Sequence, residues 1–356
     1  MKKKTIAATA VLTFAILLSS CTVSVKKTSS SDTSVTTTPV TMTTVPAPQN
    51  GGHEFNPHVL SDFFRQAYGP GFEQDFYSYC DAVLNAEDFV KLNDKANYSR
   101  CRLAVRMCLP VADTYISMID TADEETKADE MDNKDGTYKL EYTVPKEEIP
   151  GLVEEFKARV KTLIDSCCME DDTPLEKVFA LYMEESTRLD YDWGAEEGTP
   201  ETSRRLSVYH ALMEDKGICQ EIAGAYTYLL LQVDVDASTC SAMTHDFQYG
   251  HEWTVVKLGD KYYHCDITAQ TQEKLTLRYF GMNDSKREKE GDYAPDTFNY
   301  GCINMIYHEG LPITDATYEP LWKAKFYEID HEKNVLYCYE SSGNDGKAYL
   351  ELPLGV

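Results

Sequence analysis

The chain has 356 residues and a formal net charge of -25 at pH 7. This length is enough for a sizeable core and for one to three domains. A chain this acidic is a poor partner for nucleic acid, because nothing offsets repulsion from the phosphates, and tight contact with an anionic lipid surface is disfavoured for the same reason. We expect most of the acidic side chains to form a solvated face.

Residues 1–20 have the pattern of a signal peptide, with the basic start MKKK followed by the apolar run TIAATAVLTFAILL. The next residues, Leu18-Ser19-Ser20-Cys21, resemble a bacterial lipobox, in which the cysteine takes a lipid and becomes the mature N-terminus. The alternative is an ordinary secretory signal with an incidental cysteine. The apolar run is shorter than the ~20 residues that span a bilayer. We therefore predict a lipoprotein anchored through Cys21 to the outer face of a membrane at the bacterial cell surface.

Residues 21–52 are rich in Ser, Thr, Val and Pro, and they predict a spacer that cannot bury a core. Residues 53–150 are expected to form a mainly helical N-terminal region, with helices over 72–92 and 99–109 and a strand over 137–144. No chemical motif precedes residue 170. A further helix is expected over 147–168.

A domain is predicted over residues 151–290. Thr173-Pro174-Leu175-Glu176 indicates a helix start with a capping box. A short helix is expected over 204–216, and Gly217 ends it just before Cys219. The apolar spacing after Cys219 predicts a helix that buries Ile222, Tyr226, Leu229 and Leu230.

Strands follow this helix. We expect one over 236–244, a hairpin over 251–268, and a β-rich extension over 291–356 with two strands within 324–340. Helices followed by consecutive strands favour an α+β fold.

The hairpin register can be derived from its turn. Gly259-Asp260 suits a type II′ turn, so Leu258 should pair with Lys261. This register places Trp253 opposite Asp266 and His251 opposite Thr268. His251, Trp253 and Asp266 then share one face, with His251 and Asp266 about 7–8 Å apart diagonally.

Cys219, His251 and Asp266 are the candidate catalytic residues. A thiol at a helix start is favoured as thiolate, an imidazole can take its proton, and a carboxylate can hold the imidazole in one tautomer. The register turns Cys265 to the other face, opposite Thr254, which argues against it as nucleophile. His264 and His245 remain alternatives for the base.

The N–H groups at the start of the Cys219 helix suit part of an oxyanion hole. Gln220 and Trp253 are the tentative substrate or oxyanion residues, and Tyr209 and Trp193 are alternatives for the second donor. Apart from Cys21 and Cys219, nine cysteines remain, so they cannot all pair, and the interpretation we favour is small buried side chains. There is no CxxC and no zinc-type spacing, so we predict neither metal nor cofactor.

GICQEIAGAYTYLLL and HEWTVVKLGDKYYHCDIT resemble the transglutaminase-like superfamily. The shared features are Gly217 and Cys219, His251 and Trp253, then Tyr262, Tyr263 and Asp266. The resemblance implies a papain-like core, with the nucleophile helix packed on an antiparallel sheet, and a Cys–His–Asp triad. Gln220-Glu221 and Ala269-Gln270 depart from the family pattern, and they bear on substrate preference.

We therefore expect a surface-anchored thiol enzyme that acts on amide bonds of proteins, peptides or cell-wall peptides through an acyl-enzyme. Hydrolysis would make it a peptidase or amidase, and transfer to an amine would make it a transglutaminase-like acyltransferase. The alternative is a non-catalytic lipoprotein that keeps the fold and binds peptide or wall material.

Overall fold

The computed structural model describes residues 52–109, 111, 124–195, 207–273, 276–301, 311–330, 333–340 and 348–354. The predicted signal peptide and all but the last residue of the predicted spacer lie outside these ranges. Among the described helices, none combines the length and the apolar character needed to cross a membrane.

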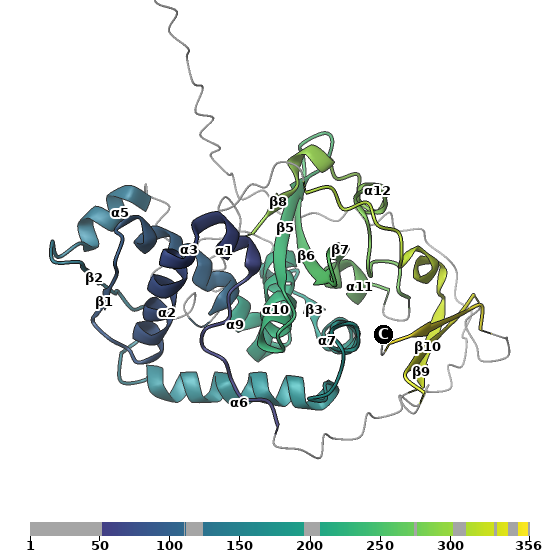
Figure 1. Ribbon diagram of the computed structural model, residues 1–356, viewed down its shortest axis with the longest axis horizontal. Coiled ribbons are helices and arrows are strands. Elements are labelled where there is room, and N and C mark those ends of the chain that lie inside the picture. The colour runs from purple at the N-terminus through teal and green to yellow at the C-terminus, as the bar shows by residue number, and fades with distance from the viewer. Residues whose placement is uncertain are drawn as a thin grey trace, which may run out of the picture.

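The N-terminal region is mainly helical and lies at the left of Figure 1. Its elements are α1 (Asp62–Tyr68), α2 (Pro70–Leu84), α3 (Ala96–Cys108), α5 (Glu124–Met131), and the paired strands β1 (Phe89–Lys91) and β2 (Thr137–Lys139). The helix predicted over 72–92 was too long. It ends at Leu84 because Ala86 takes a positive φ of 52°, and β1 follows.

Two long helices lead into the second half of the chain. Helix α6 (Ile149–Cys167) runs along the lower edge of the molecule beneath the other helices (Figure 1). Helix α7 (Pro174–Arg188) begins with the predicted capping box, in which Thr173 and Glu176 satisfy each other's backbone N–H groups. The buried side of α7 includes Val178, Leu181 and Tyr182.

The central sheet is antiparallel and has the strand order β7-β6-β5-β8. Its strands are β5 (Ala237–Met243), β6 (Gly250–Leu258), β7 (Lys261–Cys265) and β8 (Asn299–Tyr300). The predicted hairpin register is confirmed, since Leu258 pairs with Lys261 and Thr254 with Cys265. Gly259 has a φ of 65°, as the first central residue of a type II′ turn requires.

The second hairpin strand is shorter than predicted. It ends at Cys265, and Asp266 instead caps the short helix α11 (Ile267–Thr271). Thr268 therefore lies on a helix and not opposite His251. The side chain of Asp266 accepts the N–H of Ala269, which favours this local cap over a longer strand.

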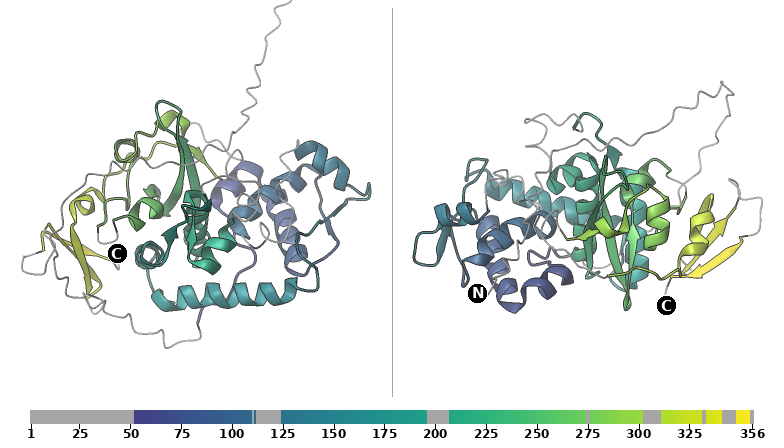
Figure 2. Two further views of the ribbon diagram at one scale, coloured as in Figure 1. Left: turned by 180° about the vertical axis from the view of Figure 1, so that it is seen from behind. Right: turned by 90° about the horizontal axis from the view of Figure 1, so that it is seen from above.

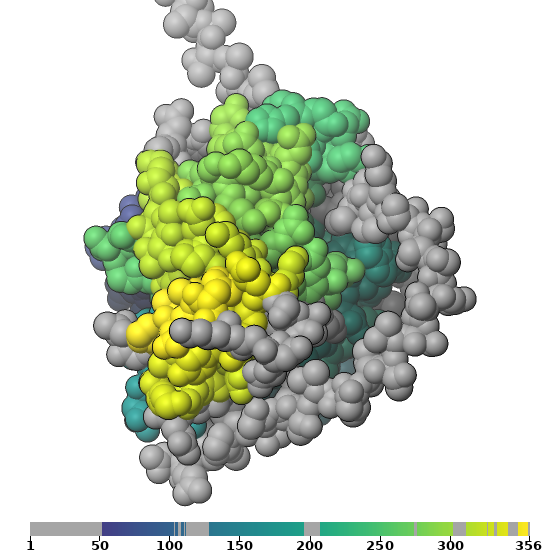
Figure 3. All heavy atoms as spheres, turned by 90° about the vertical axis from the view of Figure 1, so that its right-hand side faces the viewer, coloured from purple at the N-terminus to yellow at the C-terminus, as the bar shows by residue number. Residues whose placement is uncertain are grey.

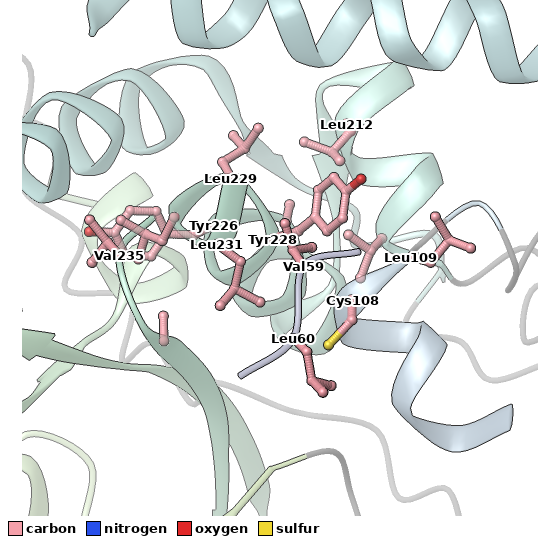
Figure 4. Close-up of a cluster of buried hydrophobic side chains, with 14 of the residues drawn as sticks. Val59, Leu60, Cys108, Leu109, Leu212, Tyr226, Tyr228, Leu229, Leu231 and Val235 are labelled. Carbon is pink, nitrogen blue, oxygen red and sulfur yellow. The ribbon is translucent and has the colours of Figure 1, made fainter. Parts of the chain in front are cut away.

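Helix α10 (Cys219–Gln232) lies at the centre of the protein and is buried on almost every side. Helix α9 (Val208–Glu214) and the parallel pair β3 (Asp190–Tyr191) and β4 (Lys216–Gly217) precede it. Figure 4 shows Tyr228, Leu229 and Leu231 of α10 in one apolar cluster with side chains of the N-terminal region, Val59, Leu60, Cys108 and Leu109. This packing joins the N-terminal region to the second half of the chain.

The remainder of the chain follows α11. It comprises α12 (Asp284–Lys289), two single-turn helices η2 (Pro295–Thr297) and η3 (Glu319–Lys323), and strands β9 (Phe326–Asp330), β10 (Val335–Tyr339) and β11 (Leu350–Pro353). The last three form a separate antiparallel sheet, which includes the two strands predicted within 324–340. This sheet lies at the far end of the molecule from the N-terminal helices (Figures 2 and 3). The architecture as a whole is α+β.

Candidate active site

Cys219 is the first residue of α10, and its position is fixed by the buried carboxylate of Glu221. That carboxylate accepts the N–H of Ile218 at 2.9 Å and the N–H of Ser207 at 2.8 Å. Gly217 leaves room for it, because a Cβ at this residue would lie 2.9 Å from Cβ of Glu221. The first-turn N–H groups of a helix have no partner within the helix, so they are suited to stabilise negative charge beside the thiol.

Helix α10 packs along β6 in a way that brings its start to the His251 end of the strand. The Thr254 hydroxyl donates to the carbonyl of Ala223 at 2.9 Å. Just beyond the other end of the helix, the backbone carbonyl of Asp236 accepts the N–H of Lys257. Because Ala223 is one turn from Cys219 and Thr254 is three residues from His251, the helix start and the strand start lie at the same end of this layer.

His251 and Asp266 form a direct hydrogen bond, with Nε2 and Oδ2 2.9 Å apart. Both side chains are buried, and Asp266 has no exposed surface. Burial alone would raise the pKa of Asp266, but the charges of His251 and Arg287 outweigh it and hold the pKa at about 2. Asp266 is therefore a carboxylate at neutral pH and accepts from the imidazole.

Arg287 is a functional candidate that the sequence analysis missed. Its guanidinium lies 2.9 Å from the same Asp266 oxygen that meets His251, and the side chain is only 2% exposed. It belongs to the charged run DSKREKEGD, which is typical of a solvated surface. The one signal in the sequence is that arginine, unlike lysine, suits buried pairing with a carboxylate.

The alternative bases lie in other settings. His264 is fully buried, accepts the indole N–H of Trp253 at 2.8 Å through Nδ1, and is 2.9 Å from Asp284 through Nε2. His245 pairs with Glu288 on the surface. Cys265 is opposite Thr254, as predicted, and burial raises the pKa of its thiol to about 12, which disfavours it as a nucleophile.

The candidate oxyanion and substrate residues differ in their exposure and in the groups that they contact. Trp253 is 1% exposed and its N–H is engaged by His264, so this geometry disfavours it as an oxyanion donor. Gln220 is the second residue of α10 and half-buried. Tyr209 is half-buried and stacks on Phe156. Trp193 is 51% exposed, and its neighbour Asp192 donates its N–H to the carbonyl of Gly217, so Trp193 lies close to the segment that leads into Cys219.

The described cysteines are thiols. They are Cys80, Cys101, Cys108, Cys167, Cys168, Cys219, Cys240, Cys265 and Cys338, and all are buried except Cys167, which is half-buried. Among the residues that the structure describes, no group of three or more His, Cys, Asp or Glu side chains could hold a metal ion.

Comparison with known proteins points to one family. Residues 161–267 match the family model described as the transglutaminase-like superfamily. No curated protein matches the chain.

The chain is also similar, at low identity, to two solved structures. One is described as a "Putative Cysteine Protease from Cytophaga hutchinsonii", with 18% identity and a TM-score of 0.22, covering 26% of this chain and 30% of that one. The other is described as a TGase, with 14% identity and a TM-score of 0.29, covering 35% of this chain and 34% of that one. The chain thus spans about a third of the length of each structure. The family match over residues 161–267, which contain the Cys219 helix and the hairpin, identifies a transglutaminase-like domain within this α+β chain.

Proposed function

We propose that this chain is a thiol enzyme that acts on amide bonds through Cys219, His251 and Asp266. The observation that carries the proposal is the buried hydrogen bond between His251 Nε2 and Asp266 Oδ2 at 2.9 Å. His251 lies near the start of β6, and the Cys219 helix begins at the same end of that strand. An imidazole held by a carboxylate can serve as base and then as acid.

The reaction proceeds in two steps. The Cys219 thiol gives its proton to His251 as the sulfur attacks the amide carbon, His251 passes that proton to the departing amine, and a thioester remains on the enzyme. Water or a second amine then attacks the thioester, His251 takes the proton of the attacking group, and the sulfur leaves. Water gives a carboxylic acid, and an amine gives a new amide. The first-turn N–H groups of α10 stabilise the oxyanion in both steps.

The substrates that we propose are proteins or peptides, including cell-wall peptides, met at the bacterial cell surface. The proposed location follows from the signal pattern and Cys21, which predict a lipid anchor. Replacing Cys21 by Ser in the full chain tests it, because the protein should then leave the membrane fraction. Retention of Cys21→Ser in that fraction would contradict a lipid on this residue.

A thiol-reactive acylating probe tests the nucleophile. We expect the wild type to be labelled on Cys219 and Cys219→Ala to lose the label, while Cys167→Ala, a half-buried thiol outside the site, keeps it. Labelling of Cys219→Ala at full strength would exclude Cys219.

Product analysis then separates the activities. Surface proteins and wall peptides from the organism are incubated with wild type or Cys219→Ala, with and without an added primary amine. A new acid identified by mass spectrometry indicates hydrolysis, and incorporated amine indicates transfer. Binding without any Cys219-dependent product would favour the non-catalytic lipoprotein.

A further inference from the structure

Arg287 is buried against the Asp266 carboxylate, although it comes from a run of charged residues outside the matched range 161–267. Its NH1 lies 2.9 Å from Asp266 Oδ2, which is also 2.9 Å from His251 Nε2. One carboxylate oxygen therefore meets both groups. The other oxygen, Oδ1, accepts the N–H of Ala269, so the carboxylate is held at both ends.

Aromatic rings hold the guanidinium in place. Its carbon lies 4.5 Å from the centroid of Trp253 and 4.6 Å from that of Tyr293. Tyr293 also stacks on His251, with 5.4 Å between ring centroids. Such cation–π contacts are strongest where the cation is desolvated, as it is here.

These contacts do not satisfy every N–H group of Arg287. Its Nε is buried and has no hydrogen-bond partner among the described residues. In an exposed arginine, this N–H would donate a hydrogen bond to water. The cost of burying it indicates that the position of the guanidinium is set by Asp266 and the rings.

We propose that Arg287 is a positioning residue for the active site, which fixes the Asp266 carboxylate and sets the pH range over which His251 gains and loses its proton. This inference rests on the proposed function. Because Arg287 neutralises the charge of Asp266 before His251 is protonated, the imidazolium is stabilised less than it would be beside an unpaired carboxylate.

Other charged and titratable groups surround this pair. Tyr182, Tyr279 and Cys265 interact electrostatically with Asp266. His264 and Cys240 interact with Arg287, Asp284 interacts with both of these residues, and Glu252 interacts with Cys240. In the part of the chain that the structure describes, the ion-pair partners of Asp266 are Arg287 and His251, and none of these surrounding groups pairs with it. Arg287 is therefore the group whose removal should change the proton affinity of the site most.

The test is the pH dependence of Cys219 alkylation by iodoacetamide, followed by peptide mass spectrometry, in wild type, Arg287→Met, Arg287→Lys and Lys289→Met. This readout needs no substrate. Lys289 is an exposed cation on the same helix, so its variant changes the net charge equally without touching Asp266. Folding of each variant is checked by circular dichroism and thermal unfolding.

In Arg287→Met we expect the alkaline limb of the profile, where His251 loses its proton, to move to higher pH by about one to two units. Arg287→Lys should keep the wild-type limb with a lower rate, and Lys289→Met should match wild type. If Arg287→Met does not fold, Arg287→Gln provides the same change of charge.

A purely structural role for Arg287 would lower the rate without moving the limb, and that result would overturn the inference. Loss of the proposed function is distinguishable from this outcome. If the proposed function were wrong, iodoacetamide would show no preference for Cys219 over the other thiols of the wild-type protein at any pH.

Discussion

The indole N–H of Trp253 donates to Nδ1 of His264 at 2.8 Å, and the Trp253 ring also contacts that of His251, with 5.8 Å between centroids. This bond determines the tautomer of His264, because a nitrogen that accepts carries no proton. The proton must then be on Nε2, which donates to Oδ1 of Asp284 at 2.9 Å. Trp253, His264 and Asp284 thus form a hydrogen-bonded chain, from two buried rings to a partly exposed carboxylate, beside the face on which His251 lies.

Trp253→Phe should break this chain. Phenylalanine keeps an aromatic ring but leaves Nδ1 of His264 buried without a donor, and its ring attracts the Arg287 guanidinium less strongly. We expect the free energy of unfolding to fall by about 2–4 kcal/mol, from the lost bond, the lost ring area and the weaker cation–π contact.

Urea denaturation measures this effect, and Trp193→Phe is the control. Trp193 is 51% exposed, so the same chemical change should cost less than about 0.5 kcal/mol there. Equal losses in the two variants would show that the bond to His264 contributes nothing.

His264 should also make stability depend on pH. Burial lowers the pKa of its imidazole, and Asp284 only partly opposes this effect. As pH falls, His264 therefore becomes protonated near pH 6.5 in the unfolded chain but only at lower pH in the folded protein. The stability from neutral His264 is fully present above pH ~6.5 and is lost as pH falls below it.

NMR of the imidazole resonances checks this expectation, with His264 assigned from their loss in His264→Gln. The His264 ring should stay neutral, with its proton on Nε2, at pH values well below 6.5. The thermal midpoint should fall over the same range. Protonation of His264 in the folded protein at pH 6.5 or above would contradict this reasoning.

Much of this site could be derived from the sequence because it depends on local rules. Gly259-Asp260 specifies the turn, and the turn specifies which residues pair, so the sequence alone places His251 and Asp266 together. The capping box at Thr173 and Glu176 is equally local.

Features that depend on tertiary packing could not be derived in this way. Asp266 ends its strand early because its carboxylate caps α11, and alternation along a strand does not reveal that choice. Arg287 lies on a helix of six residues, too short for periodicity to separate a buried side from a solvated one. Its burial depends on Trp253, which comes from the distant strand β6, and on Tyr293, which follows shortly after α12.

Gly217→Ala should displace the start of the Cys219 helix. The added methyl carbon would lie 2.9 Å from Cβ of Glu221 and 3.1 Å from its Oε2, and neither atom can retreat because the carboxylate is held by two backbone N–H groups. We expect a loss of stability of about 1–3 kcal/mol, as for other overpacked sites, and slower alkylation of Cys219.

Gly151→Ala is the matched control for that variant. Gly151 lies in the first turn of α6, and an added Cβ would meet nothing within 4 Å. Alanine there should leave alkylation unchanged and stabilise the helix by up to about 1 kcal/mol. If both variants behave alike, the close approach of Gly217 to Glu221 does not position Cys219.

Glu221→Gln should destabilise the same helix start, and by an amount that depends on pH. The amide can accept only one of the two N–H groups, from Ile218 or Ser207, and it presents its own NH2 to the other, at a cost of about 1–3 kcal/mol.

The hydrogen bond to Glu221 also raises the pKa of His210, although burial opposes it. A raised pKa contributes stability that is present below pH ~6.5 and is lost as pH rises through the folded value. The difference in unfolding free energy between wild type and Glu221→Gln should therefore be larger at pH 5.5 than at pH 8.5 in urea titrations. Glu214→Gln, which alters a side chain 58% exposed, should show a much smaller difference, and an equal loss for Glu221→Gln at both pH values would exclude His210 from the network.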